Sequence, residues 1–308
     1  MWEGTLKIIA CADLHITNKC PKSRNDNYYS EVLRKFSEIL KHSYQKTLIV
    51  AGDFFDKHNV SNEVIRDVVD ILRGHLGRVL VVPGQHDLRY HSKGLKNTPL
   101  GILEATKFIE ILSSKEIKIV NGVSYIGSGW GESPDKDENC EIMVTHQMVT
   151  LDGPLFPGHE DYTTAAQLLN KYPGIDIIIS GDNHKPHVYV NDNNQLQINC
   201  GSMMRKSKDQ MDFKPRIYEI DTDKLSVEPI FLTVNKDVFD LDAIEREEEK
   251  EIVQEKANEN IQKFLKTLDV SDSEKPNFAN MLKKVIEVSK PKKEVTEIIN
   301  NIMEKIND

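Results

Sequence analysis

Between about residues 6 and 234, short runs of apolar residues recur along the chain, and five of them stop abruptly on polar residues. Apolar runs bounded in this way are typical of strands buried on both faces, as at the centre of a parallel sheet. The five predicted strands cover residues 8–12, 48–51, 79–83, 143–146 and 177–180. Asp, His or amide side chains lie at the end of each strand. We therefore expect them to gather at one rim, where open α/β sheets bind their ligands.

Between these strands, apolar residues recur every three or four positions, which predicts helices that pack one face on a sheet. One such face comprises Tyr29, Val32, Leu33, Phe36, Ile39 and Leu40, and another comprises Val64, Ile65, Val68, Ile71 and Leu72. Alternating strands and helices are the signature of βαβ units, so the sequence predicts an α/β fold.

After Leu103 the apolar runs become shorter and more β-like, with strands predicted at 117–120 and 123–127. A hairpin is predicted from 188–190 and 196–199, because the polar turn 191–194 joins them. Two further strands, 216–220 and 226–233, are expected to complete this second sheet, which we predict to be more antiparallel than the first.

The composition shifts near Lys236, which divides the chain into a predicted domain at 1–235 and a helical tail at 236–308. Between Lys236 and Val270 there are eleven acids, six bases and no glycine or proline, which favours a solvated helix. Apolar stripes at helical spacing nevertheless follow at 253–268 and 295–306. Such stripes must be buried, either by folding back within the chain or against a partner.

The length of 308 residues allows one large α/β domain and a further region. The formal net charge of −9 argues against a protein that coats nucleic acid electrostatically, because such binding needs Lys and Arg to neutralise phosphates. A metal-centred site could still bind phosphodiesters locally, since the cations supply the charge.

No basic segment followed by an apolar stretch opens the chain, and no run approaches the roughly 18 to 20 apolar residues that cross a bilayer. The four cysteines are scattered and form no Cys-x-x-Cys motif, which is typical of reduced thiols. We therefore expect a cytoplasmic protein without a membrane span.

The residues at the strand ends suit a pair of hard divalent cations. Such ions need carboxylates, imidazoles or amides, and one bridging ligand, and as a pair they can activate water at phosphorus. One Asp-x-His is a weak signal, whereas five motifs in order predict a two-metal centre. The series is Asp13-x-His15, Gly52-Asp53-x-x-Asp56, Gly84-Gln85-His86-Asp87, His146 and Gly181-Asp182-Asn183-His184.

This series resembles the calcineurin-like metallophosphoesterase superfamily, whose pattern is D-x-H, G-D-x-x-D, G-N-H-D/E, H and G-H-x-H. The resemblance covers roughly residues 6–234. It implies a four-layer metallophosphoesterase β-sandwich flanked by helices, here with the C-terminal helical tail. It also implies metal-dependent phosphodiester hydrolysis with two divalent cations, Mn²⁺ or Mg²⁺.

By this resemblance, Asp53 would bridge two metals. Asp13, His15 and His184 would hold one metal, and Gln85, His146 and Asp182 the other. His86 would face the scissile phosphate, with Asp87 fixing its orientation. Gln85 stands where the family usually has Asn, and Asp182 where it has His; the added charge of Asp182 favours Mn²⁺ or Mg²⁺ over softer ions. His159 matches no ligand position, but it follows a loop that could border the site.

Within the superfamily the chain looks most like the nuclease subunits of double-strand-break repair complexes, of the bacterial SbcD and phage exonuclease kind. His146-Gln147, the spacing from Asp53 to Gln85, and segment 199–205 carry this likeness. It implies an exo- or endonuclease acting on DNA in repair or recombination, with its tail bound to an SMC-like coiled-coil ATPase; a homodimer is also possible. The alternatives are a stand-alone phosphatase or phosphodiesterase of small molecules, and a non-catalytic scaffold, because fold does not determine substrate.

Overall fold

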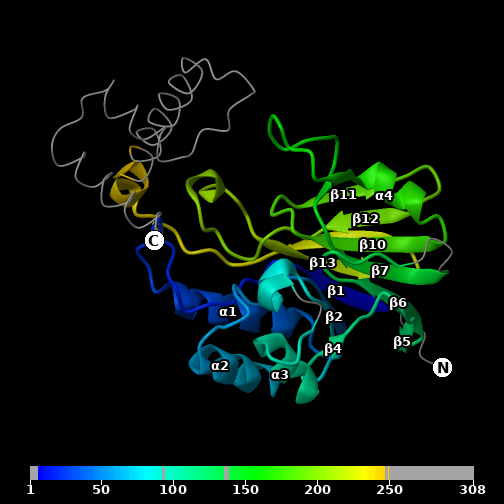
Figure 1. The fold of residues 1–308 in the computed structure, drawn as a ribbon, viewed down its shortest axis with the longest axis horizontal. Helices are drawn as coiled ribbons and strands as arrows, with labels where there is room; N and C mark the ends of the chain where they lie inside the picture. The colour runs from blue at the N-terminus through cyan, green and yellow to red at the C-terminus, as the bar shows by residue number, and fades with distance from the viewer. Residues whose placement is uncertain (1–5, 92–93, 135–138, 247–248, 250–308) are drawn as a thin grey trace, which may run out of the picture. The chain divides into compact units, whose positions relative to one another are not determined.

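The computed structural model describes residues 6–91, 94–134, 139–246 and 249 (Figure 1). The chain divides into two compact units, Met1–Glu245 and Arg246–Asp308. The apolar stripes predicted at 253–268 and 295–306 lie outside the described residues. The first residues of the predicted tail, up to Glu245, belong to the first unit: Val238 is buried, and its carbonyl accepts a hydrogen bond from the Asn25 N–H at 3.1 Å.

Two six-stranded sheets form the first unit. The first sheet has the order β14 (Ser226–Phe231), β13 (Arg216–Asp221), β1 (Lys7–Cys11), β2 (Thr47–Ala51), β3 (Val79–Val82) and β4 (Glu110–Ile111). It is parallel from β1 to β4, and β13 and β14 are antiparallel.

The second sheet has the order β11 (His187–Val190), β12 (Leu196–Asn199), β10 (Ile175–Gly181), β7 (Cys140–His146), β6 (Val123–Ser128) and β5 (Lys118–Val120). Its four central strands are parallel, and antiparallel hairpins form both edges. Two short strands, β8 (Val149–Thr150) and β9 (Thr163–Thr164), pair separately.

Two predictions about the sheets were wrong. The strands at 216–220 and 226–233 extend the first sheet beside β1 instead of completing the second, and the second sheet is parallel at its centre. The parallel centre follows from the apolar runs of β7 and β10, which are buried on both faces. The edge position of β14 suits Pro229, which cannot donate a ladder hydrogen bond.

Helices cover the outer faces of both sheets, which gives the four layers that were predicted (Figure 1). The helices α1 (Tyr28–His42), α2 (Asn62–Leu72) and α3 (Pro99–Ala105) pack on the first sheet, and α4 (Ala165–Lys171) packs on the second. Alternate residues of a strand face different layers: Ile9 packs under the helices, whereas Ile8 packs between the sheets. Short 3₁₀ turns lie at Gln85–Asp87 (η1), Arg89–His91 (η2) and Lys208–Gln210 (η3).

The long helices begin at capping side chains. Asn27 accepts a hydrogen bond from Ser30 N–H at the start of α1, and Ser61 accepts one from Val64 N–H at the start of α2. Both helices follow strand ends, so the chain returns along the sheet and brings the next parallel strand to the same edge. Strand β2 packs across β7 and β10, so the predicted rim is formed by two sheets together.

All four cysteines are free thiols, of which Cys20 is exposed and the other three are buried. Among the described residues, none of the helices combines the length and the apolar character that a membrane span requires.

Lys35 in α1 generates a prediction about stability. Its side chain is buried, and Nζ donates to the Met203 carbonyl at 3.2 Å. Burial lowers its pKa to about 8, against about 10.4 in the unfolded chain. Between these values the unfolded chain binds more protons, so the contribution of Lys35 to stability rises with pH.

We expect the free energy of unfolding of the wild type, minus that of Lys35→Met, to rise by about 1–2 kcal/mol between about pH 7.5 and about pH 9.5. Urea denaturation at both pH values measures it. The exposed Lys41→Met variant is the control, and a difference that is flat with pH would show that Lys35 stays charged in the fold.

Candidate metal centre

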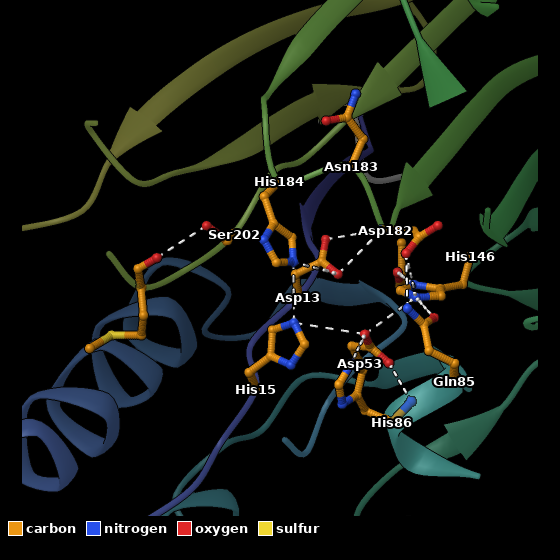
Figure 2. A network of polar contacts seen from close by, with 12 residues as sticks. Asp13, His15, Asp53, Gln85, His86, His146, Asp182, Asn183, His184 and Ser202 are labelled. Carbon is orange, nitrogen blue, oxygen red and sulfur yellow. Dashed lines mark hydrogen bonds and ion pairs between the residues drawn. The ribbon is translucent and has the colours of Figure 1, made fainter. Parts of the chain in front are cut away.

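The predicted site residues do converge at the rim where the two sheets meet (Figure 2). They come from the ends of five strands: Asp13 and His15 after β1, Asp53 after β2, Gln85, His86 and Asp87 in η1 after β3, His146 at the end of β7, and Asp182 and His184 after β10. The first three strands belong to the first sheet and the other two to the second. The site therefore lies across the junction of the sheets.

Asp13, His15 and His184 form one candidate metal-binding group, with one ligand atom of each within 4.8 Å of the others. The Nε2 atoms of His15 and His184 face each other at 3.3 Å, and His184 Nε2 lies 3.9 Å from Asp13 Oδ1. Asp13 and His15 are buried, whereas 42 % of the His184 side chain is exposed. This group is the predicted ligand set of the first metal, and it opens to solvent at His184.

Asp53 lies between this group and its neighbours. Its Oδ2 is 3.7 Å from His15 Nε2, 3.5 Å from His146 Nε2 and 3.9 Å from His86 Nε2. Asp53 also belongs to two further candidate groups, one with Asp13 and His146 and one with His15 and His86. Asp53 is therefore the candidate for the bridging carboxylate.

Gln85, His146 and Asp182 gather on the other side of Asp53. His146 Nε2 lies 2.7 Å from Gln85 Oε1 and 3.9 Å from Asp182 Oδ1, and Gln85 Nε2 donates to Asp182 Oδ1 at 3.0 Å. The extra methylene of Gln85, relative to Asn, therefore does not carry its amide oxygen away from the centre. The predicted second ligand set is assembled around His146.

The donors fit hard divalent cations. His146 Nδ1 lies 2.8 Å from the Ala51 carbonyl, which can only accept, so Nδ1 carries a proton and Nε2 is the ligand nitrogen. His15 likewise presents Nε2 to the centre, 3.7 Å from Asp53 Oδ2. Carboxylate, imidazole and amide donors of this kind are those expected for Mn²⁺ or Mg²⁺.

The electrostatics also favour a bound cation. Burial, together with the charges of Asp53 and Asp182, raises the pKa of Asp13 well above its ordinary value. Burial opposes charge on His146 and Asp53 as well, but their ion pair raises the pKa of His146 to about 10 and lowers that of Asp53 to about 2. The His146 imidazolium thus supplies the positive charge that the buried carboxylates require, and a cation would replace its Nε2 proton.

Residues 6–186 match the calcineurin-like phosphoesterase family. The chain belongs to this family. The family implies metal-dependent phosphoester hydrolysis at a dinuclear site of divalent metals, for which this chain has candidate ligands. A search of curated proteins found no match.

A search of solved structures matched TT1561 of Thermus thermophilus, with 12 % identity, 74 % of this chain and 99 % of that chain covered, and a TM-score of 0.46. A single mutant of Vps29 from Entamoeba histolytica has 15 % identity, covers 75 % of this chain and 100 % of its own, and has a TM-score of 0.35. A dimetal phosphatase from Danio rerio has 10 % identity and a TM-score of 0.44, and the match covers 77 % of this chain and 99 % of that chain.

The backbone of the phosphoesterase is strained where the ligands leave the strands. Asp13, His15, Asp53 and Asp182 have φ of 50°, 45°, 47° and 79°, in the left-handed region that residues other than glycine rarely adopt. Gly52, at φ 88°, precedes Asp53, and a Cβ there would overlap the His146 ring. The glycine of this motif is therefore needed for the close approach of the two sheets.

The predicted role of Asp87 was wrong. Its buried carboxylate accepts backbone N–H groups from Phe54 at 3.1 Å, Phe55 at 3.0 Å and Gly84 at 3.0 Å. The His86 ring is held instead by the Asp56 carbonyl, 2.8 Å from Nδ1. Burial raises the pKa of Asp87 to about 7, although the hydrogen bonds from the three N–H groups act to lower it. Side chains diverge in the η1 turn, so Asp87 points inward and holds two ligand loops together.

Sequence reasoning assigned no role to Asp56 or Lys206. Lys206 Nζ pairs with Asp56 Oδ1 at 2.9 Å, and the same oxygen lies 3.7 Å from His15 Nδ1. Asp56 was part of the quoted motif, but Lys206 comes from a distant segment that no local pattern connects to it. This ion pair therefore places the Lys206 ammonium group beside the metal centre.

A buried amide network supports the last ligand loop. Asn199 Nδ2 donates to the carbonyls of Asn183 at 2.6 Å and Lys185 at 2.9 Å, and its Oδ1 accepts from Ser180 at 3.0 Å. The following segment passes beside the ligands, since Ser202 N–H donates to the His184 carbonyl at 3.3 Å. Segment 199–205, noted in the sequence, therefore positions Asp182 and His184.

Asp53 generates a prediction about metal content. We expect Asp53→Asn to weaken binding of both metal equivalents by at least about 100-fold, because even outer-shell partners of a metal ligand contribute 10–100-fold. Equilibrium dialysis with Mn²⁺ measures this, with Asp70→Asn on the exposed face of α2 as the matched control. Unchanged stoichiometry in Asp53→Asn would exclude a bridging role.

Proposed function

We propose that the chain is a two-metal phosphodiesterase that cuts DNA with Mn²⁺ or Mg²⁺. The observation that carries the proposal is the meeting of two ligand sets at one buried carboxylate, Asp53. Asp13, His15 and His184 would hold one cation, and Gln85, His146 and Asp182 the other. When bound, such a pair activates water and stabilises charge at phosphorus.

His86 is the residue best placed to act on the substrate itself. Its side chain is 42 % exposed above Asp53, and its Nδ1 proton is held by the Asp56 carbonyl. Nε2 is therefore the nitrogen that faces the substrate. As an imidazolium, His86 would donate the Nε2 proton to a phosphate oxygen or to the leaving oxygen.

Two pockets, of about 680 Å³ and about 400 Å³, meet at Met148 and Asp182 beside the metal centre. A phosphate with one substituent would leave one pocket unused, whereas a diester could extend into both. This supports a phosphodiesterase over a monoesterase. The complete set of donors argues against a non-catalytic scaffold.

The choice of DNA rests on the resemblance to repair nucleases. Although the formal net charge of the chain is −9, the cations would supply positive charge locally, where the phosphodiester binds. The proposed partner, an SMC-like ATPase, rests on the sequence alone, because the apolar stripe at 295–306 lies outside the described residues. Deleting residues after about Val270 should then abolish co-purification with such an ATPase while hydrolysis of small diesters persists.

The deciding experiment incubates the purified protein and Mn²⁺ with labelled linear DNA, bis-p-nitrophenyl phosphate and p-nitrophenyl phosphate. We expect cleavage of the DNA and the diester, little action on the monoester, and no activity in EDTA. Cleavage of bis-p-nitrophenyl phosphate but not of DNA would favour the small-molecule phosphodiesterase. No hydrolysis of any substrate would favour the scaffold.

His86 generates a further prediction. His86→Ala should lower kcat on the diester by roughly 10²- to 10⁴-fold, the usual contribution of a positioned acid or base, while the Mn²⁺ stoichiometry stays unchanged. Turnover and metal content are measured on the same preparation. His42→Ala, at the exposed end of α1, is the control. Loss of one metal equivalent along with activity would make His86 a ligand instead.

A further inference from the structure

The larger pocket has walls that the proposed chemistry does not use. His146 and Asp182 form its inner side, and Trp130, His159 and Tyr162 lie along it farther out. Its volume of about 680 Å³ is within the range of roughly 300–1,000 Å³ for small-ligand pockets. It therefore has room for a group attached to a phosphate at the metal centre.

Three aromatic rings contact one another in turn along the loop between β8 and β9, with His159 between Phe156 and Tyr162. The Phe156 and His159 rings are stacked with centroids 4.8 Å apart, and the Tyr162 ring lies 5.2 Å from His159 at an interplanar angle of 32°. The Leu155 N–H donates to His159 Nδ1 at 3.3 Å, which orients that ring. The pairing of β8 with β9 closes the base of this loop.

The charges of the pocket suit an uncharged aromatic ligand. Its charged lining residues, apart from histidines, are Glu132, Asp161 and Asp182, and none of its described lining residues is Lys or Arg. The carboxylates of Glu132 and Asp161 would repel a phosphate but could accept hydrogen bonds from the amino groups of a nucleobase. The smaller pocket differs in having a lysine, Lys185, in its lining, together with Asp182 and Asp209.

We propose that the larger pocket binds the nucleobase of the nucleotide joined to the scissile phosphate, by stacking on Tyr162. The inference rests on the proposed phosphodiesterase function and adds the recognition of one base to it. Stacking of a base on an aromatic side chain is sequence-tolerant, because every base has a π face. The backbone on the other side of the phosphate would then lie along the pocket that contains Lys185.

A dinucleotide tests the proposal, because it has a single phosphodiester. The substrates are the deoxyadenosine dinucleotide and its two analogues that lack one base each. For the wild type, kcat/KM should fall about 5- to 150-fold on one analogue, which corresponds to the usual energy of base stacking. Tyr162→Ala should lose a similar factor on the intact dinucleotide but less than about 2-fold on that analogue, since the ring and the base act as a pair.

Tyr162→Phe keeps the ring and should behave as the wild type, and Tyr44→Ala, which removes an exposed ring after α1, is the control. Independent losses, in which Tyr162→Ala lowers kcat/KM equally on the dinucleotide and on both analogues, would overturn the proposal.

A binding measurement separates this inference from the proposed function. Deoxyadenosine carries no phosphate, so its binding in EDTA requires neither metal nor hydrolysis, and Trp130 in the pocket reports it by fluorescence quenching. We expect binding at least about 5-fold weaker in Tyr162→Ala than in the wild type. Equal quenching in both proteins would overturn the base subsite. Binding that depends on Tyr162, without hydrolysis of any diester, would support the subsite and refute the phosphodiesterase.

Discussion

The ion pair between Asp53 and His146 joins the two sheets at the place where the site forms, and the other candidate ligands are arranged around it. Asp53 follows β2 in the first sheet, and His146 ends β7 in the second. His146 also donates to the Ala51 carbonyl from its other nitrogen. Because both side chains are buried, removing one partner from the metal-free protein would leave an uncompensated charge, at a cost of about 3–5 kcal/mol. This pairing therefore determines how the edges of the two sheets meet.

The close approach of the sheets has a conformational cost. Gly52 and Gly181 lie where a Cβ would overlap the opposite sheet, and four ligands occupy the left-handed region at roughly 1–3 kcal/mol each. Buried hydrogen bonds hold this geometry: the Asp87 carboxylate joins the loops after β2 and β3, and Asn199 fixes the loop after β10. The donors are consequently held in place by the fold, which lowers the reorganisation needed when a cation binds.

The surroundings of the metal centre are chemically asymmetric. On one side, aromatic rings and the carboxylates of Glu132 and Asp161 line a pocket beside His146. On the other, Lys185 and Asp209 line a pocket beside His184. Lys206, paired with Asp56, adds a cation close to His15. A phosphodiester at the centre would therefore meet different surfaces on its two sides. This difference would favour one orientation of the bound diester, which the metal ligands alone would not do.

The sequence by itself determined the strands that bear the ligands and the residues at their ends, because apolar runs and the polar residues that stop them are local signals. Asp13, Asp53, His146 and His184 could be placed at the rim for this reason. Only the tertiary structure decided the pairing of β13 with β1, since an amphipathic strand satisfies the same pattern in either sheet. The inward turn of Asp87 and the pocket between Trp130 and Tyr162 were likewise decided by packing between distant segments, which no local periodicity records.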